Sequence, residues 1–161
     1  LEIDEDDPLW ICKVQEEKFK KACYADMMPA IIWLGDYELP KALPLLETAE
    51  SEYKIFALSI LAENSVRFAL KDGKDIKESV VFCRTLGKEE QAACFDGLVS
   101  GLMQFGPPTK EYEGALALCN EEYLTESEKS TCYPLVISYS RGIYSPEKVD
   151  EICKLIGDRC S

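Results

Sequence analysis

The stretch that decides the fold is CRTLGKEEQAAC, which runs from Cys83 to Cys94. Its first part ends an apolar stripe over residues 76–86, Gly87 stops that stripe, and a second stripe begins at Lys88. Glycine commonly follows a helix end because it lacks the Cβ that would clash in a left-handed conformation. The stretch therefore predicts two successive helices that each carry a cysteine, with the two cysteines 11 residues apart.

Cysteine pairs with similar spacing recur along the chain. The other separations are 11, 13 and 7 residues, for Cys12 and Cys23, Cys119 and Cys132, and Cys153 and Cys160. Leu46 and Ala57, also 11 apart, occupy the corresponding places where one pair is missing. The first members of the pairs then follow each other at steps of 34, 37, 36 and 34 residues. A sustained period in this range is typical of an α-solenoid, in which helix pairs stack on their neighbours.

Apolar residues at helical spacing predict long and short helices in alternation, about nine in all. Thr125 and Glu128 have the spacing of a capping box, and Ser145-Pro146 has the form of a helix start. No window alternates with the period of a strand, so the chain is expected to be all-α. The expected helices span residues 18–33, 52–71, 76–86, 88–105, 112–123, 125–139 and a last segment from 145.

The turn after the first long helix reads Leu34-Gly35-Asp36-Tyr37-Glu38, followed by Lys41-Ala42-Leu43 and Leu46. This turn resembles the tetratricopeptide family, whose unit is a helix pair of about 34 residues with a Gly-x-Tyr type turn. The resemblance covers nearly the whole chain as four repeats. It implies one domain, residues 1–161, folded as a right-handed α-solenoid of about four helix pairs, with disulfides between consecutive helices as in secreted relatives.

Eight cysteines could form disulfides, remain buried thiols or bind a metal. Histidine is absent and no two cysteines are separated by only two residues, so no metal site is expected. The Leu46 and Ala57 pair also favours disulfides, because a packed apolar pair can replace a covalent link but not two metal ligands. The shared spacing favours the pairing Cys12–Cys23, Cys83–Cys94, Cys119–Cys132 and Cys153–Cys160. Disulfides persist outside the reducing cytosol, which predicts a secreted, periplasmic or cell-surface location.

The charge balance excludes two classes of partner. The chain carries 18 basic and 30 acidic residues, for a net charge of −12. Binding to nucleic acid or to an anionic membrane surface depends on an excess of Lys and Arg. No apolar run reaches the roughly 18 residues of a membrane span. The acidic excess is therefore expected to form a solvated surface or, at most, to favour a basic partner.

No catalytic or cofactor-binding pattern is recognisable. Without histidine, acid–base chemistry would depend on Asp, Glu, Lys or Tyr, and no glycine-rich phosphate loop is present. The sequence therefore favours a non-catalytic module that binds or scaffolds a protein or peptide. A structural envelope protein and a carboxylate-based hydrolase remain alternatives.

The expected partner-binding face is the outward side of the long helices. The candidate residues on that face are Glu63, Arg67, Asp96, Ser100 and Tyr139. Trp10 and Trp33 are expected to lie in the core, since large aromatic side chains are highly buried on average.

Overall fold

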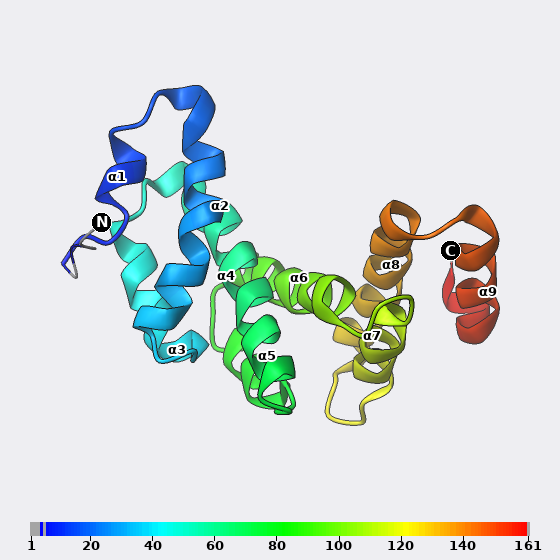
Figure 1. Cartoon of the computed structure of the whole chain (residues 1–161). Helices are drawn as coiled ribbons and strands as arrows, with labels where there is room; N and C mark the ends of the chain where they lie inside the picture. The colour runs from blue at the N-terminus through cyan, green and yellow to red at the C-terminus, as the bar shows by residue number, and fades with distance from the viewer. Residues whose placement is uncertain (1–3, 5, 161) are drawn as a thin grey trace. The chain divides into compact units, whose positions relative to one another are not determined.

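A computed structural model describes residue 4 and residues 6–160 of the chain. These residues form helices and connecting loops without a strand, which confirms the prediction of an all-α chain. Figure 1 shows the elements in chain order. They are α1 (Trp10–Lys13), α2 (Glu17–Leu34), α3 (Leu39–Ala42), the 3₁₀ helix η1 (Leu43–Thr48), α4 (Ser51–Lys71), α5 (Lys77–Cys83), α6 (Lys88–Phe105), α7 (Glu111–Asn120), α8 (Glu126–Ile143), α9 (Pro146–Ile156) and the 3₁₀ helix η2 (Gly157–Cys160).

The chain divides into two compact units, and the boundary between them falls inside α6. Unit 1 extends to Leu98, and unit 2 begins at Val99. The sequence predicted a single domain over residues 1–161, of which residues 1–3, 5 and 161 lie outside the described residues.

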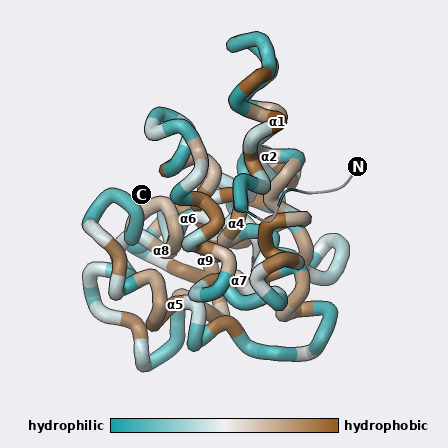
Figure 2. Tube along the Cα trace, turned by 90° about the vertical axis from the view of Figure 1, so that its left-hand side faces the viewer, coloured by the Kyte–Doolittle hydropathy of each residue, from teal (hydrophilic) through white to brown (hydrophobic). Residues whose placement is uncertain are grey.

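The core of unit 1 forms where α2 packs along α4 (Figure 1). On α2, Tyr24, Met28 and Ile31 are buried, and their spacing of four and three residues places them on one helix face. The buried face of α4 includes Leu58, Leu61, Ala62 and Val66 with the same periodicity. Figure 2 shows this pattern as hydrophobic and hydrophilic stretches that alternate along the tube. Complete burial of each large apolar side chain contributes about 1.5–3 kcal/mol.

A polar cluster fastens α2 to the start of α4. The Tyr24 hydroxyl accepts a hydrogen bond from the Glu50 backbone N–H at 3.2 Å and donates one to the Glu50 carboxylate at 3.2 Å. Lys20 forms an ion pair with the same carboxylate at 2.7 Å. The Tyr24 ring stacks on Tyr53 of α4 with a centroid distance of 4.9 Å. The Tyr24 hydroxyl thereby satisfies the Glu50 N–H, which precedes the first turn of α4 and has no partner within that helix.

Within unit 1, α4 and α6 make a close backbone approach at Gly97. A Cβ atom on residue 97 would lie 2.1 Å from the Ser59 carbonyl oxygen and 2.9 Å from the Ala62 Cβ. Nearby, the Ser59 hydroxyl donates a hydrogen bond to the Asp96 carboxylate at 3.4 Å. Only glycine fits at this position, as expected for a residue that permits close helix packing.

Unit 2 comprises the end of α6 from Val99 together with α7, α8, α9 and η2, and α8 contacts both α7 and α9. The helix starts follow the sequence signals. Thr125 and Glu128 form the predicted capping box, in which each side chain accepts a hydrogen bond from the other residue's backbone N–H. Ser145 caps α9 by accepting a hydrogen bond from the Lys148 N–H, with Pro146 as the first helical residue. The unit buries Cys119, Cys132, Tyr133, Val136, Ile137 and Ile152.

Four disulfides are present in the structure. Cys12–Cys23 links α1 to α2, and Cys83–Cys94 links α5 to α6. In unit 2, Cys119–Cys132 links α7 to α8, and Cys153–Cys160 links α9 to η2. Leu46 and Ala57, the residues at the vacant cysteine positions, are both buried in unit 1.

Candidate functional site

An open groove of about 610 Å³ lies in unit 1. Four segments form it: the turn from α2 into α3, the start of α3, the C-terminal half of α4, and the loop into the start of α5. Its volume lies within the range of about 300–1,000 Å³ that is usual for ligand sites. The groove is therefore large enough for the side chains of several residues of a partner protein.

Two aromatic rings form one part of the groove. The Tyr37 ring lies 4.5 Å from the Phe68 ring between centroids, at an interplanar angle of 46°. Tyr37 is 44 % exposed, so much of its surface remains open to a ligand. Such rings attract cations through their negative faces.

The turn that presents Tyr37 is strained. Asp36 and Tyr37 have φ angles of +54° and +65°, a left-handed conformation that is costly for a residue as large as tyrosine. Gly35 precedes them and lies against Ala42, where a Cβ on residue 35 would approach within 2.6 Å. The Tyr37 N–H donates a hydrogen bond to the Ile32 carbonyl at 2.8 Å, which closes the end of α2. The tight turn therefore fixes the position of the Tyr37 side chain.

Acidic side chains dominate the polar lining of the groove. Its lining includes four carboxylates, from Glu38, Asp72, Asp75 and Glu78, and one ammonium group, from Lys74. Lys74 lies 3.7 Å from Asp72, and Glu38 lies 3.1 Å from Lys41. These exposed ion pairs are weak and solvent-screened, so they leave the groove with an excess of negative charge.

The residues predicted from the sequence do not line this groove. Glu63 and Arg67 belong to α4, and the Arg67 guanidinium lies over the ring of the lining residue Phe68, 5.9 Å from its centroid. Arg67 is exposed, and Glu63 is partly exposed.

The other three predicted residues divide between the units. Asp96 is partly exposed in unit 1, where it accepts the hydrogen bond from Ser59. Tyr139 is partly exposed in unit 2. Ser100 is only 3 % exposed, so the outward orientation expected for it is wrong. Its hydroxyl accepts a hydrogen bond from Gln104 at 3.2 Å, which lets this small polar side chain be buried.

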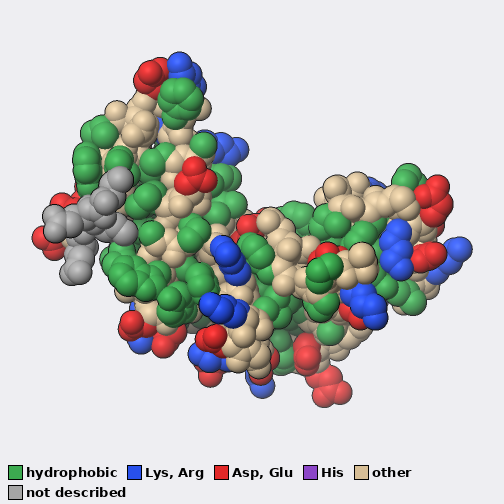
Figure 3. Space-filling model, in the orientation of Figure 1, with side chains coloured by type: hydrophobic (Ala, Val, Ile, Leu, Met, Phe, Trp, Pro, Cys, Tyr) green, Lys and Arg blue, Asp and Glu red, His purple; other side chains and the backbone are tan. Residues whose placement is uncertain are grey.

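The two tryptophans lie at the surface, against the prediction that they belong to the core. Trp10 is 43 % exposed and Trp33 is 56 % exposed. Figure 3 shows hydrophobic side chains at the surface over α1 and α2, where Val14 and Phe19 are exposed as well.

The sequence did contain a signal for the groove of unit 1. The two turns that line it, 34–38 and 72–75, hold equivalent positions in successive predicted repeats.

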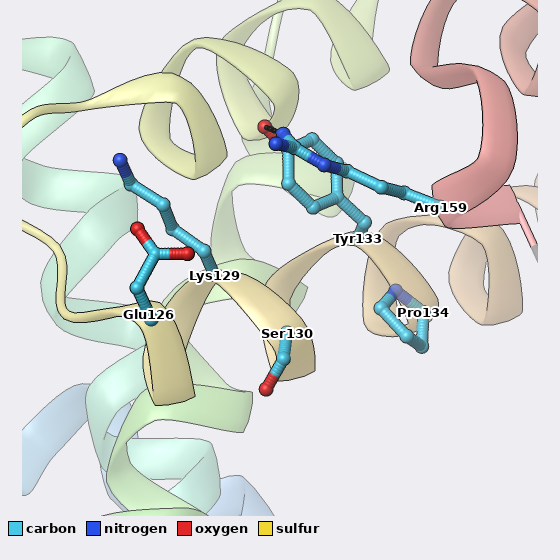
Figure 4. A pocket seen from close by; sticks show the side chains of 6 residues that line it. All are labelled: Glu126, Lys129, Ser130, Tyr133, Pro134 and Arg159. Atoms are coloured by element: carbon cyan, nitrogen blue, oxygen red, sulfur yellow. Dashed lines mark hydrogen bonds between the residues drawn. The ribbon is translucent and has the colours of Figure 1, made fainter.

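A second pocket, of about 280 Å³, lies in unit 2. Five of its lining residues form a stripe along α8, and the sixth, Arg159, belongs to η2 (Figure 4). The stripe comprises Glu126, Lys129, Ser130, Tyr133 and Pro134. No pattern in the sequence singles out these residues, because residue 159 is far from α8 along the chain.

The start of α7 and the loop before α9 share a tyrosine–carboxylate contact in unit 2. The Tyr144 hydroxyl donates a hydrogen bond to the Glu111 carboxylate, and its ring meets Tyr112 edge to face. This hydrogen bond lowers the pKa of Glu111 below its ordinary value of 4.5. Burial, together with the same bond, raises the pKa of Tyr144 to about 12. Both shifts keep the acceptor ionised and the donor protonated near neutral pH, which suits a structural contact.

Comparisons with protein-family models, with curated proteins and with solved structures found no match to this chain. Within the part of the chain that the structure describes, every helix lacks the length or the apolar character needed to cross a membrane.

Proposed function

We propose that the protein is a non-catalytic binding module that holds a basic segment of a partner protein in the groove of unit 1. One observation carries this proposal: four carboxylates and an exposed aromatic ring converge in the same groove. Carboxylates attract Lys and Arg side chains, and an aromatic face stabilises the same cations when they are partly desolvated.

The net charge of −12 supports the proposal from outside the groove. An acidic surface raises the rate at which a basic partner arrives, even where its charges make no contact in the complex. Local recognition would then depend on the groove and its aromatic pair.

Placement in an oxidising, extracytoplasmic compartment is part of the proposal. Its support is the four disulfides, since such bonds are rare in the cytosol.

The proposal also includes the repeat architecture. Its helix pairs are α2 with α3, α4 with α5, α6 with α7 and α8 with α9, as in a tetratricopeptide-like solenoid. In unit 1 the successive long helices pack on one another, α2 on α4 and α4 on α6 at Gly97. Packing between neighbouring repeats is the basis of such folds.

The test is a calorimetric titration of the full chain, with its disulfides intact, against a short peptide of alternating lysine and alanine. The proposal predicts saturable binding that weakens when the ionic strength rises from ~0.05 to ~0.3 M, because salt screens exposed charges. The control peptide replaces each lysine with glutamate and should not bind. Equal binding of both peptides, or binding of neither, would reject the proposal.

A further inference from the structure

The pocket in unit 2 contains an arginine that is held in place before any ligand arrives. Arg159 Nη1 donates a hydrogen bond to the Tyr133 hydroxyl at 2.7 Å. The Arg159 guanidinium also lies over the Tyr133 ring, 4.8 Å from its centroid. Tyr133 is fixed in turn, because it is 2 % exposed and its hydroxyl donates to Asn120 Oδ1 at 2.6 Å.

A disulfide next to Arg159 in the chain also restrains the position of this residue. Cys160, the residue after Arg159, is bonded to Cys153 of α9. Since α9 packs on α8, the disulfide ties the turn that carries Arg159 to the helix layer that carries Tyr133. Arginine usually loses side-chain entropy when it binds a ligand, and this arrangement has already removed part of that cost.

The fixed guanidinium retains binding capacity. A guanidinium carries five N–H donors in a planar fork, and the bond to Tyr133 uses one of them. Lys129 lies four residues before Tyr133 on α8, and therefore on the same helix face. Figure 4 shows Lys129 and Glu126 on one side of the pocket and Arg159 over Tyr133 on the other.

We propose that this pocket binds the carboxylate or phosphate group of a small molecule, between the Arg159 guanidinium and the Lys129 ammonium. A planar guanidinium fork pairs with two oxygens of such a group, and an ammonium adds a point charge. The pocket volume of about 280 Å³ lies just below the usual range of about 300–1,000 Å³, so the ligand is compact. Glu126 lines the same pocket and opposes anion binding. Removing the Glu126 charge should therefore strengthen anion binding, whereas removing the Arg159 or Lys129 charge should weaken it.

The experiment follows backbone and Arg Nε chemical shifts of the full chain by NMR. The probes are inorganic phosphate and, separately, succinate, with sodium chloride at the same ionic strength as the reference. The proposal predicts saturable shifts centred on Lys129, Tyr133 and Arg159 with at least one probe. Saturation by phosphate alone identifies the phosphate group as the ligand chemistry, and saturation by succinate alone identifies the carboxylate. Shifts no larger than those in chloride would overturn the proposal.

Three substitutions give opposed expectations. Arg159→Gln and Lys129→Gln should each weaken binding by about fivefold or more, because each removes one charge-assisted contact. Glu126→Gln should tighten binding, because it removes a repulsive charge. The matched control is Lys154→Gln, an exposed α9 lysine outside the pocket, which should leave the affinity unchanged.

The Lys154→Gln control distinguishes binding at the pocket from a general attraction of the anion to positive charge. If Lys154→Gln weakens binding as much as Lys129→Gln, the anion responds only to overall charge and the proposal is wrong. Arg159→Lys keeps the charge but loses the fork, and it should bind more weakly than the wild type. Circular dichroism confirms that each variant is folded before its affinity is compared.

Discussion

The Tyr37 ring contacts the Phe68 ring from a backbone turn in which Tyr37 has a φ angle of +65°. A bulky residue rarely adopts this conformation, and here the turn aims an exposed aromatic ring into an acidic groove. Strain of this kind is often found where side-chain placement matters for binding. The pair therefore links the local backbone to the proposed recognition of cations.

Replacing the ring should weaken binding of a basic peptide. Tyr37→Ala removes the aromatic face, and the affinity for the lysine–alanine peptide should fall about fivefold, within the range of a partly desolvated cation–π contact. Tyr37→Phe keeps the face and should bind within about twofold of the wild type. The measurement is the same calorimetric titration. A loss with Tyr37→Phe equal to that with Tyr37→Ala would assign the effect to the hydroxyl instead of the ring.

The close approach of α4 and α6 predicts a steep cost at one glycine. Gly97→Ala would place a Cβ 2.1 Å from the Ser59 carbonyl oxygen, so it should destabilise the protein by about 1–3 kcal/mol through overpacking. Gly142→Ala is the control, because nothing lies within 4 Å of its added Cβ and alanine favours a helix. Urea denaturation measures both. Equal stability of the Gly97→Ala variant and the wild type would contradict the observed helix contact.

The disulfides should contribute to stability without determining helicity. A bond that closes a loop of about a dozen residues stabilises by roughly 3 kcal/mol, whereas the apolar faces of the helices remain after reduction. We therefore expect a reductant to lower the melting temperature while the circular dichroism signal of helices persists at low temperature. An unchanged melting temperature would show that the bonds are unimportant for stability.

Peptide mapping under non-reducing conditions tests the pairing itself. The expected linked peptides join residues 11, 11, 13 and 7 positions apart. One crossed pair, such as Cys23 with Cys83, would refute the repeat alignment on which the predicted pairing rests.

The Tyr144–Glu111 hydrogen bond predicts a dependence on pH. The folded-state pKa of Glu111 lies below its ordinary value of 4.5, because the ionised carboxylate accepts the Tyr144 hydrogen bond. This stabilisation is therefore present above pH 4.5 and is lost as the pH falls through the lowered pKa. Tyr144→Phe keeps the ring but lacks the hydroxyl, so its stability should fall less between neutral pH and pH about 3. Identical urea midpoints against pH for both proteins would contradict the assignment.

The regular helices could be predicted closely because their signals are local. The expected segment 88–105 has the bounds of α6, and 52–71 differs from α4 by one residue. The capping box at Thr125 and the cap at Ser145 are also predictable from adjacent residues. The predicted bounds of the shorter helices were less accurate. The expected segment 76–86 corresponds to α5, which spans only Lys77–Cys83, because the chain leaves the helix before Gly87.

The sites could not be predicted in the same way because they combine segments distant in sequence. Tyr37 meets Phe68 across 31 residues, and Arg159 meets Tyr133 across 26. Periodicity identifies a polar helix face, but it does not show which other element lies beside that face. The prediction for Ser100 fails for the same reason, since a buried hydroxyl with a hydrogen-bond partner has the sequence pattern of an exposed one.

The groove of unit 1 is proposed to bind the basic partner, in place of the outward long-helix face that carries Glu63 and Asp96. The most direct test compares the affinity of the lysine–alanine peptide for two variants that each lose two negative charges, Asp72→Asn with Glu78→Gln in the groove and Glu63→Gln with Asp96→Asn outside it. We expect the groove variant to bind about tenfold more weakly, equivalent to about 1.4 kcal/mol, and the other variant to remain within about twofold of the wild type. The opposite order would place the site on the long-helix surface, and equal small effects would show that neither surface recognises the peptide.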